Sequence, residues 1–284
     1  MKKILAFDID GTLNDNMGNL QPGVENVLLD KRFKNCTALL VTGNTLTTVK
    51  RVKNQINIFS NTTIPTNTYS SAFGGAVVYD NNYNIIYKKH LCRKKIRKIL
   101  EKTEKIDPEF CFLLMHLDCQ TFGHIVNQKM QNKIDQSKHL LNLNLNEIIF
   151  NNEHFSTLLP KLPSSFLLNI YCPNKAEEVF KQLLPFEKEF NLSIYYFSKA
   201  QMIQICASKK INALKYMVSK LKENKQFDGT IKDVVYFGDC ANDVGCLKAC
   251  DVSFARGSNL EEYVVKNSKY YADDLTPYLD IIFK

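Results

Sequence analysis

The chain of 284 residues is 45% hydrophobic and 23% charged, which is the balance of an ordinary globular protein and excludes a disordered or fibrous one. No apolar stretch approaches the ~20 residues that a transmembrane helix needs, so we expect no membrane partner. The net charge is +8, but lysines are spread along the chain and the one dense basic run, at 88–102, lacks aromatic residues, so we expect no nucleic-acid partner.

The first apolar run and the cysteines indicate where in the cell the protein is located. The run Ile4–Phe7 ends at Asp8, which is too short for the ~7–15-residue apolar core of a signal peptide. Nine cysteines are scattered without a CxxC pair. Cys240, Cys246 and Cys250 are close enough in sequence for a metal or disulfide site, but buried reduced thiols are more typical of an intracellular chain. We therefore expect a cytoplasmic protein with free thiols.

Strands and helices alternate in the first third of the chain. Apolar runs predict three strands, at Ile4–Phe7, Cys36–Val41 and Phe73–Asp80. Helical spacing of apolar residues predicts one helix beginning near Pro22 and another over Thr45–Ile56. Continuous apolar strands that alternate with helices predict a parallel sheet covered on both faces.

The middle of the chain has a different pattern. Four strand-like segments, at 109–118, 121–127, 164–172 and 192–198, follow one another more closely and lie among Lys-rich and Asn-rich helical stretches. This pattern predicts an antiparallel sheet with helices packed on it, which forms a second domain.

After Ala200 the first pattern returns. It predicts a strand at 202–207, a helix over Lys209–Leu221, strands at Asp233–Asp239, 251–255 and 269–272, and a closing helix over Leu275–Phe283. The predicted fold class is α/β, with a Rossmann-like parallel-sheet core (1–82 and 200–284) and an inserted α+β cap domain (83–199).

Charged residues gather where the predicted core strands end. Asp8 and Asp239 each follow a strand directly, with Asp10 and Asp243 close behind them. Ligands of parallel sheets bind at this edge, so the four acids should converge and repel one another. A Mg²⁺ ion suits a few carboxylates plus a substrate phosphate, and Lys210, at the start of a helix, adds positive charge.

The same edge suits a phosphoryl group. The hydroxyl of Thr42 and the backbone N–H groups from Gly11 onward can donate to phosphate oxygens. One of the two acids Asp8 and Asp10 can attack phosphorus, and the other can protonate the leaving oxygen and then deprotonate water. Two acids are needed because the attacking group must be ionised while the donor must carry a proton.

These residues resemble a known family. The order Asp8-x-Asp10-Gly11-Thr12, Thr42-Gly43, a lysine before Ile211, and Gly238-Asp239-x-x-Asn242-Asp243 is similar to the four motifs of the haloacid dehalogenase-like phosphatases. The inserted middle and the stretch FGGAVVYD resemble the Cof-type branch, whose large α/β cap enters between the second and third motifs.

The resemblance implies a role for each matching residue. Asp8 would be the nucleophile, and Asp10 the general acid and base with its backbone carbonyl on the metal. The implied Mg²⁺ set is Asp8, Asp10, Asp239 and Asp243. The implied phosphate and substrate set is Gly11, Thr42, Gly43, Lys210 and Asn242. Lys209 is the competing choice for the lysine.

The chain also departs from the family pattern. Asn44 stands where the family often has arginine after Thr-Gly, and Ile211 stands where a glycine usually follows the motif lysine. Gly74-Gly75 replaces the usual Asn-Gly before the cap. These departures concern substrate handling rather than the chemistry of the aspartates.

The leading hypothesis is a Mg²⁺-dependent phosphatase that hydrolyses a small phosphorylated metabolite, a sugar phosphate or similar, through an aspartyl phosphate. The alternatives are a phosphomutase that uses the same aspartyl phosphate, and a non-catalytic binding protein that kept the fold. We expect substrate choice to lie in the inserted domain, with Phe112, Met115, Thr121 and His124 as candidates.

Overall fold

Two units make up the chain. The computed structural model describes residues 3–15, 17–60, 69–117, 160, 162–258 and 260–284, together with the backbone of 121–124 and 148–150. One unit, called the core here, combines Met1–Tyr87 with Lys210–Lys284. The other, called the inserted unit, is Lys88–Lys209.

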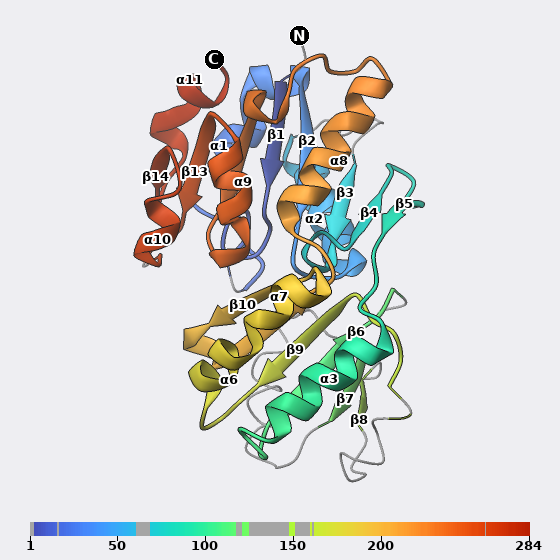
Figure 1. Cartoon of the computed structure of the whole chain (residues 1–284). Coiled ribbons are helices and arrows are strands. Elements are labelled where there is room, and N and C mark those ends of the chain that lie inside the picture. Colours follow the sequence, from blue (N-terminus) through green and yellow to red (C-terminus); the bar gives the residue numbers. More distant parts are fainter. Residues whose placement is uncertain are drawn as a thin grey trace. The chain divides into compact units, whose positions relative to one another are not determined.

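The core is built on an eight-stranded sheet (Figure 1). From edge to edge its strands are β14 (Tyr270–Ala272), β13 (Val252–Arg256), β12 (Val234–Gly238), β1 (Lys3–Phe7), β2 (Cys36–Val41), β3 (Ser70–Ala72), β4 (Val77–Tyr79) and β5 (Ile85–Lys88). The strands from β14 to β3 run parallel, and β4 runs antiparallel to β3. From β1 the chain adds β2 and β3 on one side, and after the inserted unit it adds β12, β13 and β14 on the other side of β1. The order in which strands are added therefore reverses between β1 and β12.

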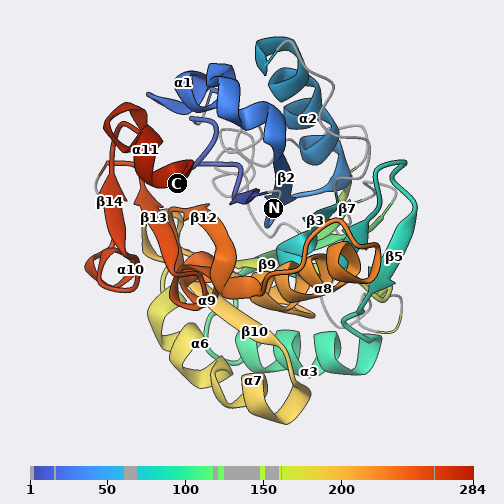
Figure 2. The same ribbon diagram turned by 90° about the horizontal axis from the view of Figure 1, so that it is seen from above.

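Helices cover both faces of this sheet. Helices α1 (Val24–Leu29) and α2 (Leu46–Ser60) lie on one face, and α8 (Lys210–Glu223) and α9 (Val244–Ala249) lie on the other, as Figure 2 shows from above. The short helices α10 (Glu262–Val265) and α11 (Leu279–Ile282) accompany β14. Every residue of β2 and β12 is buried, as expected for strands covered on both faces. The predicted doubly covered α/β core is confirmed.

A row of aromatic rings sets the register of four neighbouring strands. Phe7, Phe237, Phe254 and Tyr270 are paired across β1, β12, β13 and β14. Their ring centroids are 4.6, 5.2 and 5.0 Å apart in succession, and each pair is stacked. Because Phe7 and Phe237 lie side by side, the residues that follow them leave the sheet at the same edge.

The segment before the inserted unit differs from the sequence prediction. Residues 73–80 were expected to form one strand, whereas β3 and β4 form a hairpin joined by a short 3-10 turn at Phe73–Gly75. Phe73, Gly74 and Gly75 all have positive φ, at 55°, 65° and 87°. Three successive residues in the left-handed region reverse the chain instead of extending it.

The inserted unit has a six-stranded sheet with helices on one face (Figure 1). Its strands in spatial order are β10 (Ser193–Phe197), β11 (Met202–Cys206), β9 (Leu167–Tyr171), β6 (Cys111–Met115), β7 (Thr121–His124) and β8 (Ile148–Phe150). Neighbours are antiparallel except β7 and β8. The helices among its described residues are α3 (Arg93–Glu104), α6 (Ala176–Leu183) and α7 (Pro185–Phe190). This is the predicted α+β architecture, with β8 as a strand that sequence reasoning missed.

Strand β11 lies in the inserted unit and not in the core, where the sequence prediction placed it. It pairs along its whole length with β10 on one side and β9 on the other, so the unit extends to Lys209 instead of residue 199. A one-turn helix at Ser198–Ala200 and Gln201 at φ 49° join β10 to β11 as a hairpin. Sequential strands usually pair in this way, which the apolar pattern of β11 alone could not reveal. Within the described ranges, no helix is both long and apolar enough to cross a membrane.

A buried arginine ties the end of β13 to neighbouring segments. The guanidinium of Arg256 is fully buried and donates from Nη1 to the carbonyl of Ala272 at 3.1 Å and also to that of Asp273. Its Nη2 donates to the carbonyl of Pro22 at 2.5 Å. Burial lowers the pKa of Arg256 to about 10, which still leaves it charged at neutral pH. One side chain thus joins β13, the end of β14 and the segment before α1.

We predict that Arg256→Ala lowers the free energy of unfolding by about 2–4 kcal/mol, because three backbone carbonyls lose a charged donor and a cavity remains at the buried side chain. Urea unfolding at neutral pH measures the change. Arg97→Ala is the control, because it breaks only an exposed pair with Glu101 on α3 and should change stability by about 0.5 kcal/mol or less. Equal effects of the two variants would contradict this structural role.

Candidate active site

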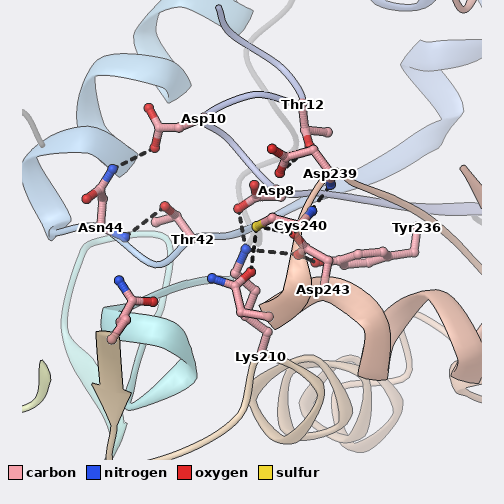
Figure 3. Close-up of polar contacts among 12 residues, drawn as sticks. Asp8, Asp10, Thr12, Thr42, Asn44, Lys210, Tyr236, Asp239, Cys240 and Asp243 are labelled. Carbon is pink, nitrogen blue, oxygen red and sulfur yellow. Dashed lines mark hydrogen bonds and ion pairs between the residues drawn. The ribbon is translucent and has the colours of Figure 1, made fainter. Parts of the chain in front are cut away.

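Polar side chains converge where β12, β1 and β2 end (Figure 3). Asp8 follows β1, Asp239 follows β12 and Thr42 follows β2. The N–H of Asp8 donates to the carbonyl of Phe237 at 2.9 Å, which continues the pairing of β1 and β12 as far as the first acid. This edge is the point where strand succession switches, and ligands of open α/β sheets bind in such a crevice.

Lys210 lies buried between two carboxylates. Its Nζ is 2.6 Å from Oδ1 of Asp8 and 2.9 Å from Oδ1 of Asp243, and all three side chains are at most 4% exposed. Lys210 is the first residue of α8. It belongs to the buried face of that helix, so its side chain points toward the strand ends. Lys209, the competing choice, is exposed. The structure therefore brings Lys210 to the aspartates and leaves Lys209 outside.

Both oxygens of Asp243 are engaged by the protein. Besides Lys210, Oδ1 accepts a hydrogen bond from the hydroxyl of Tyr236 at 2.5 Å. Oδ2 accepts from the N–H groups of Asp239 and Cys240, at 3.4 and 3.3 Å, and from the Cys240 thiol at 3.3 Å. Sequence reasoning missed Tyr236, although a tyrosine inside an otherwise apolar buried strand needs a partner for its hydroxyl.

The ion pair determines the charge states of Asp8 and Lys210. Burial raises the pKa of Asp8 well above its usual range, Asp243 and Asp239 raise it further, and Lys210 opposes them. Burial alone would lower the pKa of Lys210, but the carboxylates of Asp243 and Asp8 outweigh it and raise that pKa well above its usual value. Lys210 therefore stays charged, but the pKa of Asp8 remains raised in spite of it, so Lys210 opposes the protonation of Asp8 without cancelling it.

The carboxylate of Asp239 approaches the same centre because it packs against a glycine, Gly11. A Cβ on Gly11 would overlap the Asp239 carboxylate, and Gly11 has φ 87°, so only glycine fits there. The Thr12 hydroxyl donates to Oδ1 of Asp239 at 3.4 Å. Burial and the neighbouring Asp243 raise the pKa of Asp239 to about 6. The charge of Lys210 and hydrogen bonds with Asp8 and Cys240 offset only part of this rise.

The donor set fits a hard divalent cation. One ligand atom each from Asp8, Asp239, Cys240 and Asp243 lies within 4.8 Å of the others. Carboxylate oxygens are the ligands that Mg²⁺ prefers, whereas a thiol suits softer metals. Since Asp243 is already engaged by its own neighbours, Asp8 and Asp239 are the carboxylates best placed to hold a cation directly.

Asp10 faces a different environment from Asp8. Figure 3 shows its carboxyl turned toward Asn44, whose Nδ2 donates to Oδ2 of Asp10 at 2.7 Å. Nη2 of Arg51, on α2, lies 3.9 Å from Oδ1, and the Asp10 side chain is 32% exposed. Burial raises the pKa of Asp10, while Asn44 and Arg51 counteract part of the rise. Sequence reasoning identified Asn44 only as a departure from the family and did not find Arg51.

The remaining predicted residues lie around this centre. Thr42 is buried, and its Oγ1 accepts a hydrogen bond from the N–H of Asn44 at 3.0 Å. Gly43 lies in the same turn and is partly exposed. The side-chain carbonyl of Asn242 accepts from the Cys240 thiol at 3.1 Å. The role of these three residues in phosphate binding stays a prediction.

The candidates for substrate choice divide into two groups. Phe112 and Met115 on β6 are fully buried within the inserted unit. Thr121 and His124 lie on β7, and their side chains are outside the described residues. The assignment of substrate choice to these four residues stays a prediction.

The family follows from comparison with known proteins. A model of the haloacid dehalogenase-like hydrolases matches residues 5–274, which includes every residue of the site. The chain belongs to the haloacid dehalogenase-like hydrolases. The resemblance inferred from the motif order is thereby confirmed. A search of curated proteins found no match.

Solved structures share the fold of this haloacid dehalogenase-like hydrolase over its whole length. A sugar phosphatase of subclass IIB has a TM-score of 0.73 at 16% identity, covering 99% of this chain and 98% of its own. A phosphatase from Bacteroides thetaiotaomicron has 0.68 at 17%, covering 99% and 95%. A haloacid dehalogenase-like hydrolase from B. subtilis has 0.71 at 16%, covering 99% and 98%. The subclass IIB neighbour agrees with the Cof-type branch that the inserted unit suggested.

The acidic centre of this haloacid dehalogenase-like hydrolase should reduce its own stability when no metal is bound. An acid whose pKa rises from 3.8 to about 6 on folding holds a proton that the unfolded chain releases, so stability falls as pH rises through that window. We predict that Asp239→Asn stabilises the protein in EDTA by about 1–3 kcal/mol at neutral pH, and that the gain vanishes toward about pH 4.

Thermal unfolding in EDTA over a pH series measures this gain. Asp228→Asn, at an exposed position, is the control and should leave the pH dependence of the melting temperature unchanged. A stabilisation by Asp239→Asn that is the same at both ends of the series would rule out carboxylate burial as its cause.

Proposed function

We propose that this hydrolase is a Mg²⁺-dependent phosphatase that cleaves a small phosphorylated metabolite, such as a sugar phosphate, through an aspartyl phosphate on Asp8. The observation that carries the proposal is the contact of 2.6 Å between Asp8 and the buried Lys210, beside Asp239 at the strand ends. It is supported by family membership and by a subclass IIB sugar phosphatase with a similar fold.

The residues that would hold Mg²⁺ are the carboxylates of Asp8 and Asp239 and the backbone carbonyl of Asp10. Bound there, the ion would neutralise phosphate charge and align the phosphoryl group with Asp8. Asp243 belongs to the predicted metal set, but its contacts suit another task. With Tyr236 and two backbone N–H groups on its oxygens, it holds Lys210 in position and keeps the ammonium charged.

The first chemical step transfers the phosphoryl group to Asp8. A carboxylate oxygen of Asp8 forms a bond to phosphorus while the bond between phosphorus and the ester oxygen breaks. Asp10 gives its proton to the departing oxygen, which leaves as an alcohol. Burial raises the pKa of Asp10, which favours the protonated form that this step needs; burial also raises the pKa of Asp8, but there the contact with Lys210 opposes the rise. Lys210 offsets the negative charge that gathers around Asp8 and the phosphoryl oxygens.

The second step returns Asp8 to its starting form. Asp10, now a carboxylate, takes a proton from water as the water oxygen attacks phosphorus. The bond between phosphorus and the Asp8 oxygen breaks, which releases inorganic phosphate. The two aspartates can divide this work because Asp8 is paired with a buried cation, while Asp10 is partly exposed and held by a neutral amide.

We predict that Asp8→Asn lowers phosphate release by about 10³-fold or more while the protein still folds, because the amide keeps the shape but cannot attack phosphorus. Phosphate release is measured against a panel of sugar phosphates, nucleotides and cofactor phosphates. Asp15→Asn, farther along the same loop and partly exposed, keeps the Oδ1 acceptor that the N–H groups of Met17 and Asn19 use, and should retain activity. A folded Asp8→Asn protein with near-normal turnover would remove Asp8 from the mechanism.

The same panel tests the alternatives. A phosphomutase would move the phosphoryl group between sugar positions and would need a bisphosphate activator, whereas the proposed phosphatase releases phosphate without one. A binding protein that kept the fold would release no phosphate from any member of the panel.

We predict that chelation by EDTA abolishes turnover and that Mg²⁺ restores it, because the uncompensated carboxylates at the strand ends need a cation to admit a phosphate. Ca²⁺ should restore little activity, since its larger and looser coordination misplaces Asp8 and the phosphoryl group. A metal titration of the chelated protein measures both effects. Full activity in excess EDTA would contradict the assignment of Mg²⁺.

A further inference from the structure

We propose that Asn44 is a positioning residue for proton transfer, and that its side-chain amide orients the carboxyl of Asp10 toward the leaving oxygen. The inference rests on the proposed phosphatase function and deepens it. It concerns the position where this chain departs from the arginine that its family often has after Thr-Gly.

The contact between the two side chains is short and directional. Nδ2 of Asn44 donates to Oδ2 of Asp10 at 2.7 Å, which is a good distance for a hydrogen bond to a carboxylate (Figure 3). Nη2 of Arg51 lies farther away, 3.9 Å from Oδ1 of Asp10. The amide therefore occupies one oxygen and leaves the other for the substrate.

The backbone of Asn44 is held on two sides. Its N–H donates to Oγ1 of Thr42 at 3.0 Å, and its carbonyl accepts from the N–H of Phe73 at 2.8 Å. The N–H of Gly74 donates to the carbonyl of Thr42 at 3.1 Å, so the turn after β2 is tied to the turn between β3 and β4. A turn fixed in this way gives the amide a defined direction.

The turn that holds Asn44 stores strain. Phe73 is fully buried and has φ 55°, a backbone conformation that is unfavourable for a bulky side chain. The strained residue is the one whose N–H reaches the carbonyl of Asn44. Backbone strain of this kind persists where the surrounding structure needs the geometry that it produces.

Arg51 is less suited to the same task. Its side chain is 42% exposed, and its contact with Asp10 is 3.9 Å long, so water screens the attraction between the two charges. At this distance the Arg51 guanidinium, on α2, adds positive charge near Asp10 but makes no hydrogen bond of normal length to Oδ1. The shorter hydrogen bond from Asn44 is therefore the contact that orients the carboxyl of Asp10.

The role predicts a dependence on the leaving group. When a sugar alcohol departs, the oxygen that separates from phosphorus must take the proton of Asp10, so a misdirected carboxyl slows the step. Nitrophenolate departs as a stable anion and takes no proton. The two substrates are compared by kcat/KM, because this constant reports only the steps up to departure of the leaving group. The value of kcat also depends on the second step, in which Asp10 acts for both substrates.

The experiment measures kcat/KM of Asn44→Ala and Asn44→Asp with 4-nitrophenyl phosphate and with the sugar phosphate that the wild-type protein cleaves fastest. We expect a loss of about tenfold or more with the sugar phosphate, and a change within about twofold with the nitrophenyl ester. Asn44→Asp keeps the shape of the side chain but replaces the N–H donor with a like charge, so its loss with the sugar phosphate should equal or exceed that of alanine.

Asn26→Ala is the matched control. Its Nδ2 donates to the Thr276 hydroxyl at 2.7 Å, on α1 and away from the strand ends, so its loss should leave both substrates unchanged. Equal losses with both substrates in the Asn44 variants, or no loss with either, would overturn the positioning role. If the wild-type protein shows no turnover that depends on Asp8, the proposed function fails first, and the two failures are thereby distinguished.

Discussion

A lysine buried between two carboxylates dominates the physical chemistry of this hydrolase. Removing such charges from water costs several kcal/mol for each ion, and attraction between them offsets this only where the geometry is good and the remaining hydrogen bonds are made. Here Lys210 contacts Asp8 and Asp243, and Asp243 is further held by the Tyr236 hydroxyl and by backbone N–H groups. The end of β12, the start of α8 and the end of β1 must therefore meet at fixed distances, which links the chemistry to the register of the sheet.

The same centre contains more negative charge than one lysine can balance. Asp239 joins Asp8 and Asp243 within a few ångströms, and burial together with Asp243 raises its pKa to about 6. A site of this kind is unfavourable by itself and becomes favourable when a cation and a phosphate complete it. The instability of the metal-free site and its proposed function thus have one cause, as expected where catalytic groups are held at the expense of stability.

The two aspartates of the first motif are separated by one residue and have opposite surroundings. Asp8 continues the strand and faces the buried lysine, whereas Asp10 has left the strand and turns toward Asn44 in partly exposed surroundings. A nucleophile and a proton donor need this difference, because one must be an anion while the other holds a proton. The turn at Phe73 contributes to this difference, because the N–H of Phe73 anchors the backbone of Asn44, whose side chain holds Asp10.

Sequence by itself determined most strands and helices of the core and the candidate residues at the strand ends, because apolar periodicity and strand ends are local features. It placed Asp8 and Asp239 at neighbouring strand ends and preferred Lys210 to Lys209. It did not find the bond of Tyr236 to Asp243, the bond of Asn44 to Asp10, or the sheet that contains β11. Those three depend on which strands pair and on where side chains point after they pair. Pairing between distant segments is decided by the packing of the whole chain, and therefore only the tertiary structure could decide them.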